Sequence, residues 1–223
     1  MILNDDLGVN KNVLYDITSK YTDSIFVDLG VREGLSSKIM LSDSVKNNNK
    51  VFGVDVDWSM LNSEVSSHPN YTTILGDSST VGKYWDKKIS GLFVDTFHIK
   101  DQVLSELYFW YPHLEEGGFI AFHDTNWPIG QHDKYGDITW GRVEEGVKLF
   151  FNVDSLNYED EFIKMSNYPE SYGLTIVEIK KKKDYISELP NWKEIIDGRN
   201  HLISLFWNEE NKSNIKIDLV LNV

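Results

Sequence analysis

The sequence of 223 residues contains no cysteine. This absence excludes a disulfide framework, a thiolate zinc site and a cysteine nucleophile. Basic residues are also scarce, because 22 Lys and Arg stand against 35 Asp and Glu and give a net charge of −13. A general nucleic-acid binder normally carries a basic face, so this balance argues against nucleic acid as a partner.

Long apolar runs are absent as well. No stretch approaches the roughly 20 residues of a membrane-spanning helix, and residues 1–12 lack the apolar segment of a signal peptide. We therefore expect a cytoplasmic protein without a membrane partner. The hydrophobic content of 41% is enough for an ordinary core, and neither a repeat nor a linker divides the chain. We expect one domain over residues 1–223, with a core at about 25–180 and a C-terminal extension at 181–223.

Short apolar segments alternate with segments of helical periodicity along most of the chain. Nearly continuous apolar runs, typical of parallel strands buried on both faces, occur at residues 24–29, 51–55, 71–75, 89–94 and 119–122. Helices are predicted at 9–20, 36–46, 103–114, 141–151 and 192–196, an antiparallel strand pair at 161–165 and 173–179, and a last strand at 215–221. The sequence therefore predicts an α/β fold, with a doubly wound, Rossmann-like, mostly parallel sheet and an antiparallel C-terminal strand pair.

Two of the predicted strands end in acidic and imidazole side chains. The segment LFVDTFH contains Asp95 and His98, and the segment FIAFHDT contains His123 and Asp124. One helix separates them, so in a parallel sheet both ends emerge at the same edge, where open α/β folds bind their ligands. Carboxylates are hard oxygen ligands for divalent cations, and imidazole can act as a base near neutral pH. The pattern therefore indicates a metal and a general base at this edge.

A turn with two glycines follows the first predicted strand. In the segment FVDLGVREGLS, Gly30 and Gly34 would let a ligand approach the backbone, and the following helix offers N–H groups. The motif is not the dinucleotide pattern GxGxxG, because Arg32 stands at the middle glycine position. By itself this spacing also fits a plain strand–helix turn.

The next two predicted strands end in polar residues too. Asp55 lies about 20 residues beyond the glycine turn, where a carboxylate can accept both hydroxyls of a ribose, and Asp57 is the alternative. Gly76 is followed by Asp77 and Ser78, which suit an adenine amino group. Polar ends on three neighbouring strands together predict a nucleoside pocket.

With these motifs the chain resembles the class I S-adenosylmethionine-dependent methyltransferases, and among them the small metal-dependent O-methyltransferases. The resemblance covers about residues 25–180 and is most specific in the pattern LFVDxxH, a helix, and then PHLxxGGxIxFHDT. This group includes enzymes that methylate sugar hydroxyls of macrolide antibiotics and relatives linked to cephalosporin biosynthesis. The resemblance implies methyl transfer from S-adenosylmethionine to a hydroxyl of a sugar or glycosylated small molecule, with a small-molecule or glycan acceptor as partner.

The resemblance also implies which residues bind the cofactor. Asp28, Gly30 and Gly34 would line its methionine end, a carboxylate at the end of the second strand would hold the ribose, and the polar residues after the third strand would hold the adenine. The predicted cofactor-binding residues are Asp28, Gly30, Gly34, Ser36, Asp55, Asp77 and Ser78.

In the same group two carboxylates bind the metal and a nearby histidine takes the proton. Asp95 and Asp124 would bind Mg²⁺ or Mn²⁺, which polarises and orients the acceptor hydroxyl. His98, three residues after Asp95, matches the place of the base. His123 stands where some metal-dependent relatives have a carboxylate, and imidazole is a softer ligand that favours Mn²⁺ or Fe²⁺. Either His123 completes the metal site or it only forms a hydrogen bond nearby. Phe97 replaces a polar residue of many relatives.

Three alternatives stay open. A catechol-like phenol is the closest rival acceptor, because a metal can chelate vicinal oxygens in either case. A nicotinamide-dependent oxidoreductase is disfavoured by the glycine spacing, and a non-catalytic domain that binds the cofactor is disfavoured by the complete set of metal and base candidates. The long loop after Thr125 carries Trp127, Tyr135 and Trp140, which would form either a lid over the acceptor or a contact with a second subunit in a homo-oligomer.

Overall fold

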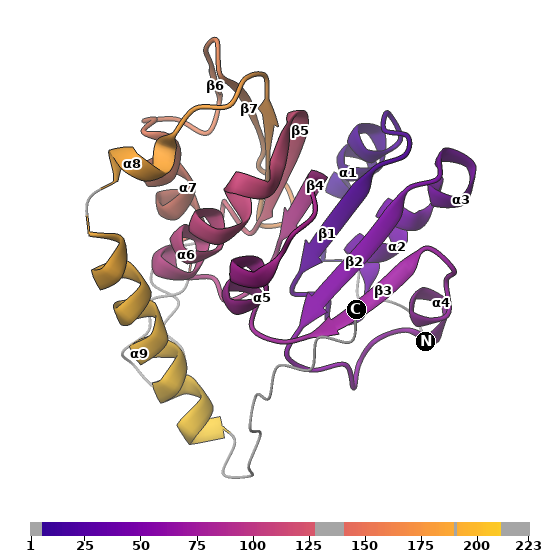
Figure 1. Ribbon diagram of the computed structural model, residues 1–223, viewed down its shortest axis with the longest axis horizontal. Coiled ribbons are helices and arrows are strands. Elements are labelled where there is room, and N and C mark those ends of the chain that lie inside the picture. Colours follow the sequence, from indigo (N-terminus) through magenta and orange to yellow (C-terminus); the bar gives the residue numbers. More distant parts are fainter. Residues whose placement is uncertain (1–5, 128–140, 190, 211–223) are drawn as a thin grey trace.

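One β-sheet organises the part of the chain that the computed structural model describes, residues 6–127, 141–189 and 191–210 (Figure 1). Its strand order is β3-β2-β1-β4-β5-β8-β7-β6. The neighbours among β1 to β5 pair in parallel, and β8, β7 and β6 continue the sheet in antiparallel pairs. The strands are β1 (Ile25–Leu29), β2 (Lys50–Asp55), β3 (Tyr71–Leu75), β4 (Ile89–Val94), β5 (Leu114–His123), β6 (Tyr158–Glu159), β7 (Ile163–Tyr168) and β8 (Leu174–Ile179). The predicted fold class is confirmed.

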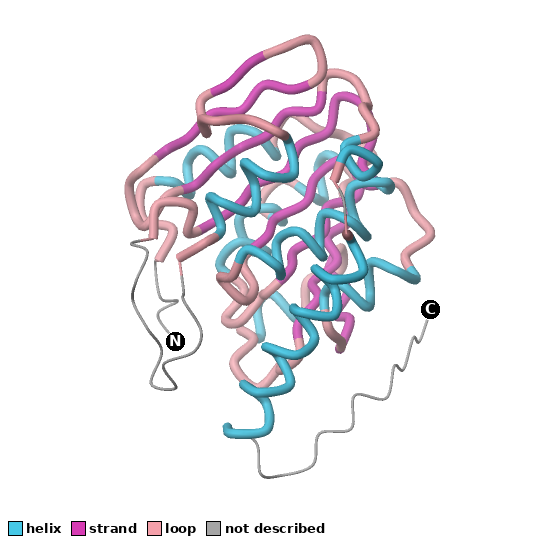
Figure 2. Tube along the Cα trace, turned by 90° about the vertical axis from the view of Figure 1, so that its left-hand side faces the viewer, coloured by secondary structure: helices cyan, strands magenta, loops and turns pink. Residues whose placement is uncertain are grey.

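Helices connect the strands and cover both faces of the sheet (Figures 1 and 2). Within the described residues they are α1 (Asn10–Thr18), α2 (Leu35–Leu41), α3 (Ser44–Asn47), α4 (Ser63–Ser66), α5 (Ser78–Tyr84), α6 (Lys100–Trp110), the 3₁₀ helix η1 (Tyr111–His113), α7 (Val143–Phe151), α8 (Tyr185–Glu188) and α9 (Trp192–Glu210). None of these described helices combines the length and apolar content that crossing a bilayer requires.

The core consists of two clusters, one on each face, because successive strand residues point to opposite sides. On β4, for example, Leu92 and Val94 pack in the cluster that includes α5, α6 and α7, whereas Phe93 packs in the cluster that includes α1 and α2. All six residues of β4 are buried. Burial on both faces explains why the parallel strands appear in the sequence as continuous apolar runs rather than as alternating ones.

Several element boundaries differ from the predicted ones. The helix expected to reach Leu114 ends at Trp110, because Pro112 has no N–H to donate and is accommodated in the first turn of η1. Strand β5 therefore begins at Leu114 rather than at Phe119, with an irregular register against β4 between the two. The helix expected at 36–46 is divided into α2 and α3.

The C-terminal part of the chain also differs from the prediction. The helix expected at 192–196 continues to Glu210 as α9, which extends past the sheet (Figure 1). The strand expected at 215–221 lies outside the described residues.

The tight packing of β4 can be tested at Gly91. A Cβ atom there would lie 2.5 Å from Phe119 Cε1 and 2.8 Å from Phe26 Cδ1, inside a core with no space for it. We expect Gly91→Ala to lower the free energy of unfolding by about 1–3 kcal/mol in urea denaturation. The matched control is Gly198→Ala in α9, where the nearest atom is 3.5 Å away, so the helix should gain up to about 1 kcal/mol. Equal urea midpoints for Gly91→Ala and the wild type would contradict the packing described.

Candidate active site

Two adjoining cavities open at the carboxyl ends of the parallel strands. The first, of about 380 Å³, is lined by Gly30, Ser36, Asp95, His98, His123 and Asp124, among others. The second, of about 280 Å³, is lined in part by Gly30, Asp55, Asp77, Ser78, Gln102 and Arg199. Gly30 and Thr96 line both. The polar residues at the ends of all five parallel strands thus line two adjoining cavities, as predicted from the sequence for this edge of the sheet.

The two cavities meet where the backbones of two loops touch. Gly30 follows β1 with φ +82°, and a Cβ atom there would lie 2.0 Å from the carbonyl oxygen of Asp95. Only glycine combines this left-handed backbone with so close an approach. The loop that carries Asp95 therefore leaves room only for glycine at position 30, in the turn predicted from the glycine motif.

The first cavity contains a cluster of two carboxylates and two imidazoles. His98 Nε2 lies 3.1 Å from Asp95 Oδ1 and 3.0 Å from Asp124 Oδ2. His123 Nδ1 lies 3.3 Å from Asp95 Oδ2 and 3.4 Å from Asp124 Oδ1, without the geometry of a hydrogen bond. The structure therefore brings together all four residues that the sequence placed at the ends of these strands.

The local backbone explains how the cluster forms. Val94 of β4 pairs with Phe122 of β5, so Asp95 and His123 leave the sheet at the same level. Asp124 then adopts a φ of +57°, a left-handed conformation that Asp tolerates better than most residues. This turn leaves its side chain almost fully buried and directed at His98.

The mutual contacts determine the charge state of the cluster. Burial would lower the pKa of His98, but the hydrogen bonds and negative charges of Asp124 and Asp95 outweigh it and raise this pKa to about 10. Burial is likewise outweighed at His123, where Asp95 is the main partner and the pKa rises to about 9. The two imidazoles in turn hold the pKa of Asp95 well below its usual range, although burial acts in the opposite direction. The buried carboxylate of Asp124 and the partly buried one of Asp95 are thus stabilised by positive charge beside them.

The donor atoms of this cluster fit a divalent cation. One ligand atom each from Asp95, His98 and Asp124 lies within 4.8 Å of the others. Asp124 Oδ1 is buried and has no hydrogen-bond partner among the described residues, which leaves an oxygen lone pair available for a cation. Two carboxylate oxygens suit Mg²⁺ or Mn²⁺. His98, rather than His123, belongs to this compact group, and the role of His123 as a ligand stays a prediction.

In the second cavity the structure separates the two ribose candidates. Asp55, at the end of β2, lines the cavity and accepts hydrogen bonds from the backbone N–H groups of Arg32 at 2.8 Å and Asp57 at 3.0 Å. The carboxylate of Asp57 instead accepts from the N–H and hydroxyl of Ser59 at an exposed turn. Asp55 is therefore the residue placed to meet a ligand in this cavity.

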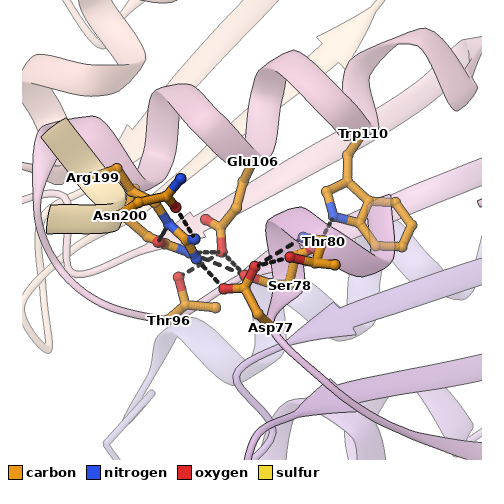
Figure 3. A network of polar contacts seen from close by, with 9 residues as sticks. Asp77, Ser78, Thr80, Thr96, Glu106, Trp110, Arg199 and Asn200 are labelled. Carbon is orange, nitrogen blue, oxygen red and sulfur yellow. Dashed lines mark hydrogen bonds and ion pairs between the residues drawn. The ribbon is translucent and has the colours of Figure 1, made fainter. Parts of the chain in front are cut away.

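Asp77 and Ser78 lie at the start of α5 on the wall of the second cavity (Figure 3). Asp77 caps this helix, because its Oδ2 accepts from the N–H of Thr80 at 2.9 Å and from its hydroxyl at 2.7 Å. Its Oδ1 forms an ion pair with Arg199 of α9. The hydroxyl of Ser78 donates to Glu106 Oε1 at 2.5 Å.

Asp28 has a different environment from the one expected. Its side chain is fully buried and accepts hydrogen bonds from the hydroxyls of Ser36 at 2.7 Å and Ser37 at 2.5 Å, at the start of α2. Burial raises its pKa to about 7, although both hydroxyls lower it. Asp28 thus holds the turn between β1 and α2 in place through these hydrogen bonds, while Ser36 lines the first cavity. Gly34 begins α2 with φ +89° and packs toward Leu61.

The sequence did not single out the polar network beneath the second cavity. Glu106 of α6 is fully buried, and its Oε1 accepts from the side chains of Ser78, Thr96 and Gln102. One signal was available, because Glu106 stands among the apolar helical positions of α6 where an acid is out of place. Arg199 could not be predicted as a site residue, because the sequence around it in α9 contains no motif.

Part of the predicted lid can be placed. The ring of Trp127 contacts that of Tyr172 in a tilted arrangement, with centroids 4.4 Å apart, and lies 5.9 Å from the ring of His98. Trp127 and Tyr172 both line the first cavity. The other two aromatic residues of that loop, Tyr135 and Trp140, lie outside the described residues.

Sequence comparison identifies the core of this arrangement. A family model described as a methyltransferase domain matches residues 27–125, which extend from β1 to the turn after β5. Residues 27–125 are thus similar to a methyltransferase domain. The match covers less than half of the chain and includes the polar ends of all five parallel strands. It supports the predicted enzyme class, that of a methyltransferase. No curated protein sequence matches the chain.

Solved structures share the fold of this methyltransferase domain at low sequence identity. A protein from Corynebacterium glutamicum superposes with a TM-score of 0.60 at 12% identity, over 79% of this chain and 83% of that one. The methyltransferase PaMTH1 of Podospora anserina, bound to S-adenosylhomocysteine (SAH), gives 0.53 at 12% identity, over 80% and 89%. The MycE methyltransferase of mycinamycin biosynthesis, in complex with Mg, SAH and mycinamycin VI, gives 0.50 at 19% identity, over 82% and 52%. This chain thus spans about half the length of MycE.

The buried acid Glu106 should make stability depend on pH. Burial raises its pKa from 4.5 to about 7, against the hydrogen bonds from Ser78, Thr96 and Gln102. An acid with a raised pKa stabilises the folded state fully below its unfolded pKa and loses this contribution as the pH rises through about 7. The loss is at most about 3 kcal/mol, since one pKa unit corresponds to about 1.4 kcal/mol.

We therefore expect the free energy of unfolding of the wild type, minus that of Glu106→Gln, to decrease between pH 5 and pH 8. Urea denaturation at several pH values measures this difference. Glu64→Gln is the matched control, because Glu64 is exposed, pairs with Lys38 and has a lowered pKa, so its difference should not decrease. A constant difference for Glu106→Gln would show that Glu106 titrates as it does in the unfolded chain.

Proposed function

We propose that the protein is an S-adenosylmethionine-dependent, divalent-metal-assisted O-methyltransferase that acts on a hydroxyl of a sugar or glycosylated small molecule. The observation that carries the proposal is the compact group of Asp95, His98 and Asp124, which lies in a cavity that adjoins a second one. The second cavity is lined by Asp55, Asp77 and Ser78, the residues predicted to bind the nucleoside. A methyl transfer to oxygen needs these two features side by side, because the cofactor and the activated hydroxyl must meet.

The residues that line the two cavities support one orientation of the cofactor. In the second cavity Asp55 would accept the ribose hydroxyls, and the adenine would lie toward Asp77 and Ser78. The methionine part would pass Gly30, which lines both cavities, and extend along Ser36 into the first. In this orientation the sulfonium methyl group would face the cluster of Asp95, His98 and Asp124.

The residues of the cluster divide the chemistry between them. A divalent cation held by Asp95 and Asp124 would polarise the acceptor hydroxyl and orient its oxygen toward the methyl group. Without a cation, Asp95 and Asp124 keep His98 protonated through its Nε2, because they raise its pKa. A cation bound by the same two carboxylates would compensate their charge and lower the pKa of His98, so that its imidazole would then accept the hydroxyl proton. When bound, S-adenosylmethionine would supply the methyl group to the acceptor oxygen and would leave as SAH once its carbon–sulfur bond breaks.

The wall of the first cavity supports a polar acceptor with a flat face. The adjacent rings of Trp127 and Tyr172 offer a surface on which the apolar face of a sugar ring can pack. Trp127 Nε1 is buried without a hydrogen-bond partner among the described residues, so it is available to an acceptor oxygen. The MycE structure, whose fold is similar, holds Mg, SAH and a macrolide. A catechol would use the same rings and the same metal, and it is the second candidate.

A methyl-transfer screen tests the acceptor class directly. Labelled S-adenosylmethionine is incubated with the protein and with nucleotide sugars, glycosylated small molecules or catechols, in Mg²⁺, in Mn²⁺ or in excess chelator. We expect label on a sugar hydroxyl only when a metal is present. Transfer to catechols alone would replace the acceptor class, and full transfer in chelator would remove the metal from the proposal.

The cofactor orientation predicts different outcomes at two neighbouring acids. Asp55→Asn should raise the dissociation constant of SAH about tenfold or more, because a charged acceptor of the ribose hydroxyls is lost at the cavity wall. Asp57→Asn is the matched control and should bind SAH as the wild type does, since its carboxylate lies at an exposed turn. Isothermal titration calorimetry measures both, and equal losses in the two variants would contradict this orientation.

The role of His98 can be separated from that of a metal ligand. If it is the base, His98→Gln should lower kcat about 10²- to 10⁴-fold, and the loss should persist at saturating Mg²⁺. Asp124→Asn should instead raise the Mg²⁺ concentration needed for half-maximal activity, while SAH affinity changes little. Recovery of the His98→Gln rate at high Mg²⁺ would show that His98 binds the metal.

A further inference from the structure

Arg199 lies inside the second cavity, far in sequence from the strands that form it. It belongs to α9, and only 7% of its side chain is exposed. Its guanidinium lies among polar side chains of other elements (Figure 3). A buried Arg at a ligand cavity is uncommon unless its charge has a partner and its N–H groups have acceptors.

The guanidinium is fixed on three sides. Its Nε donates to Gln102 Oε1 at 2.7 Å and its Nη1 to Asn200 Oδ1 at 2.9 Å, while Nη2 forms the ion pair with Asp77 Oδ1. A guanidinium has five N–H groups. The hydrogen bonds among the described residues use three of them, so N–H groups on Nη1 and Nη2 are still available to a ligand in the cavity.

Asp77 has one acceptor position left, and it lies beside these N–H groups. A carboxylate has about four lone-pair positions. Oδ2 already accepts two hydrogen bonds from Thr80, and Oδ1 accepts one from Arg199. The unused position is therefore on Oδ1, next to the guanidinium. The cavity wall thus presents a hydrogen-bond acceptor and a hydrogen-bond donor side by side.

Gln102 holds the guanidinium of Arg199 in place and is itself fixed by hydrogen bonds. Gln102 donates both of its amide hydrogens, to Ser78 Oγ at 3.0 Å and to Glu106 Oε1 at 2.6 Å. On the same helix pair, the rings of Trp192 of α9 and Tyr108 of α6 are 4.6 Å apart, which anchors α9 against the core. The donor and the acceptor are therefore held in place before a ligand binds.

We propose that Arg199 is a specificity-determining residue of the cofactor pocket, which together with Asp77 recognises the edge of the adenine ring. Adenine presents an amino donor next to a ring-nitrogen acceptor. The amino group matches Asp77 Oδ1, and the ring nitrogen matches an N–H of Arg199. This inference rests on the proposed function, because it takes a nucleoside cofactor in the second cavity as given.

The proposal predicts discrimination at position 6 of the purine. In S-inosylhomocysteine an oxo group replaces the amino group of SAH, so an acceptor oxygen would face the carboxylate of Asp77. A site built to pair with a polar group rejects an analogue that lacks it much more strongly than an apolar pocket does. We expect the wild type to bind SAH at least about 100-fold more tightly than S-inosylhomocysteine.

The test measures both dissociation constants by calorimetry in the wild type and in Arg199→Met. We expect Arg199→Met to weaken SAH binding about tenfold or more and to reduce the preference over S-inosylhomocysteine by a similar factor. Lys164→Met is the matched control, because it removes a surface ion pair with Glu178 on β8, and both affinities should stay at wild-type values. A purely structural role of Arg199 would weaken both ligands equally and leave the preference unchanged, which would overturn the inference.

Arg199→Lys keeps the experiment decisive if the Met variant does not fold. Lys restores a positive charge near Asp77 but lacks the planar fork that contacts Gln102 and Asp77 together. The preference should therefore fall in Arg199→Lys as well, and a wild-type preference in this variant would overturn the inference. The proposed function fails separately, if the wild type binds neither SAH nor S-inosylhomocysteine.

Discussion

The close approach of Gly30 to the loop after β4 is the contact on which the site depends. At this point the backbone after β1 lies against the carbonyl of Asp95, with no room for a side chain between them. Each cavity takes part of its wall from this contact, so the place where one ends and the other begins is fixed by backbone atoms. The separation of Asp55 and Asp95, which we propose to hold the nucleoside and the metal, is therefore set by the sheet rather than by flexible side chains.

A second constraint is the burial of negative charge. The chain carries a net charge of −13, and at this edge of the sheet Asp28, Glu106 and Asp124 are buried while Asp77 and Asp95 are partly buried. Each is compensated in a different way: Asp95 and Asp124 by imidazoles, Asp77 by a guanidinium, and Asp28 and Glu106 by hydroxyl or amide groups together with a raised pKa. The acids that face imidazole or guanidinium line the two cavities, whereas those that face neutral donors hold loops and helices in place.

The strand ends could be predicted from the sequence because parallel strands terminate together. Apolar runs located β1 to β5, and the polar residues after them had to meet at one edge, as Asp55, Asp77 and Asp95 do. The burial of Asp28 could also be predicted, from the two-residue period of a strand. Phe26 packs toward α2, and Asp28 shares that face, where it meets the hydroxyls of Ser36 and Ser37.

Contacts between distant segments could not be predicted in this way. Arg199 is 122 residues from Asp77, and no local pattern relates the two. The position of Pro112 was visible, but a β-strand beginning at Leu114 depends on pairing with Ile89 of a different strand. Such pairings depend on how all strands of the sheet assemble. The local sequence around one strand does not reveal them.

The position of Arg199 distinguishes substitutions in helix α9 from substitutions in the strands of the sheet. The segment matched by the methyltransferase model ends at residue 125, whereas part of the wall around the second cavity comes from a helix that begins at Trp192. Substitutions in that helix alter one end of the cavity without touching the strands or the acidic cluster. If Arg199 has the role proposed above, a chain with the same strands and acidic cluster but a different C-terminal helix would have a different ligand preference in the second cavity.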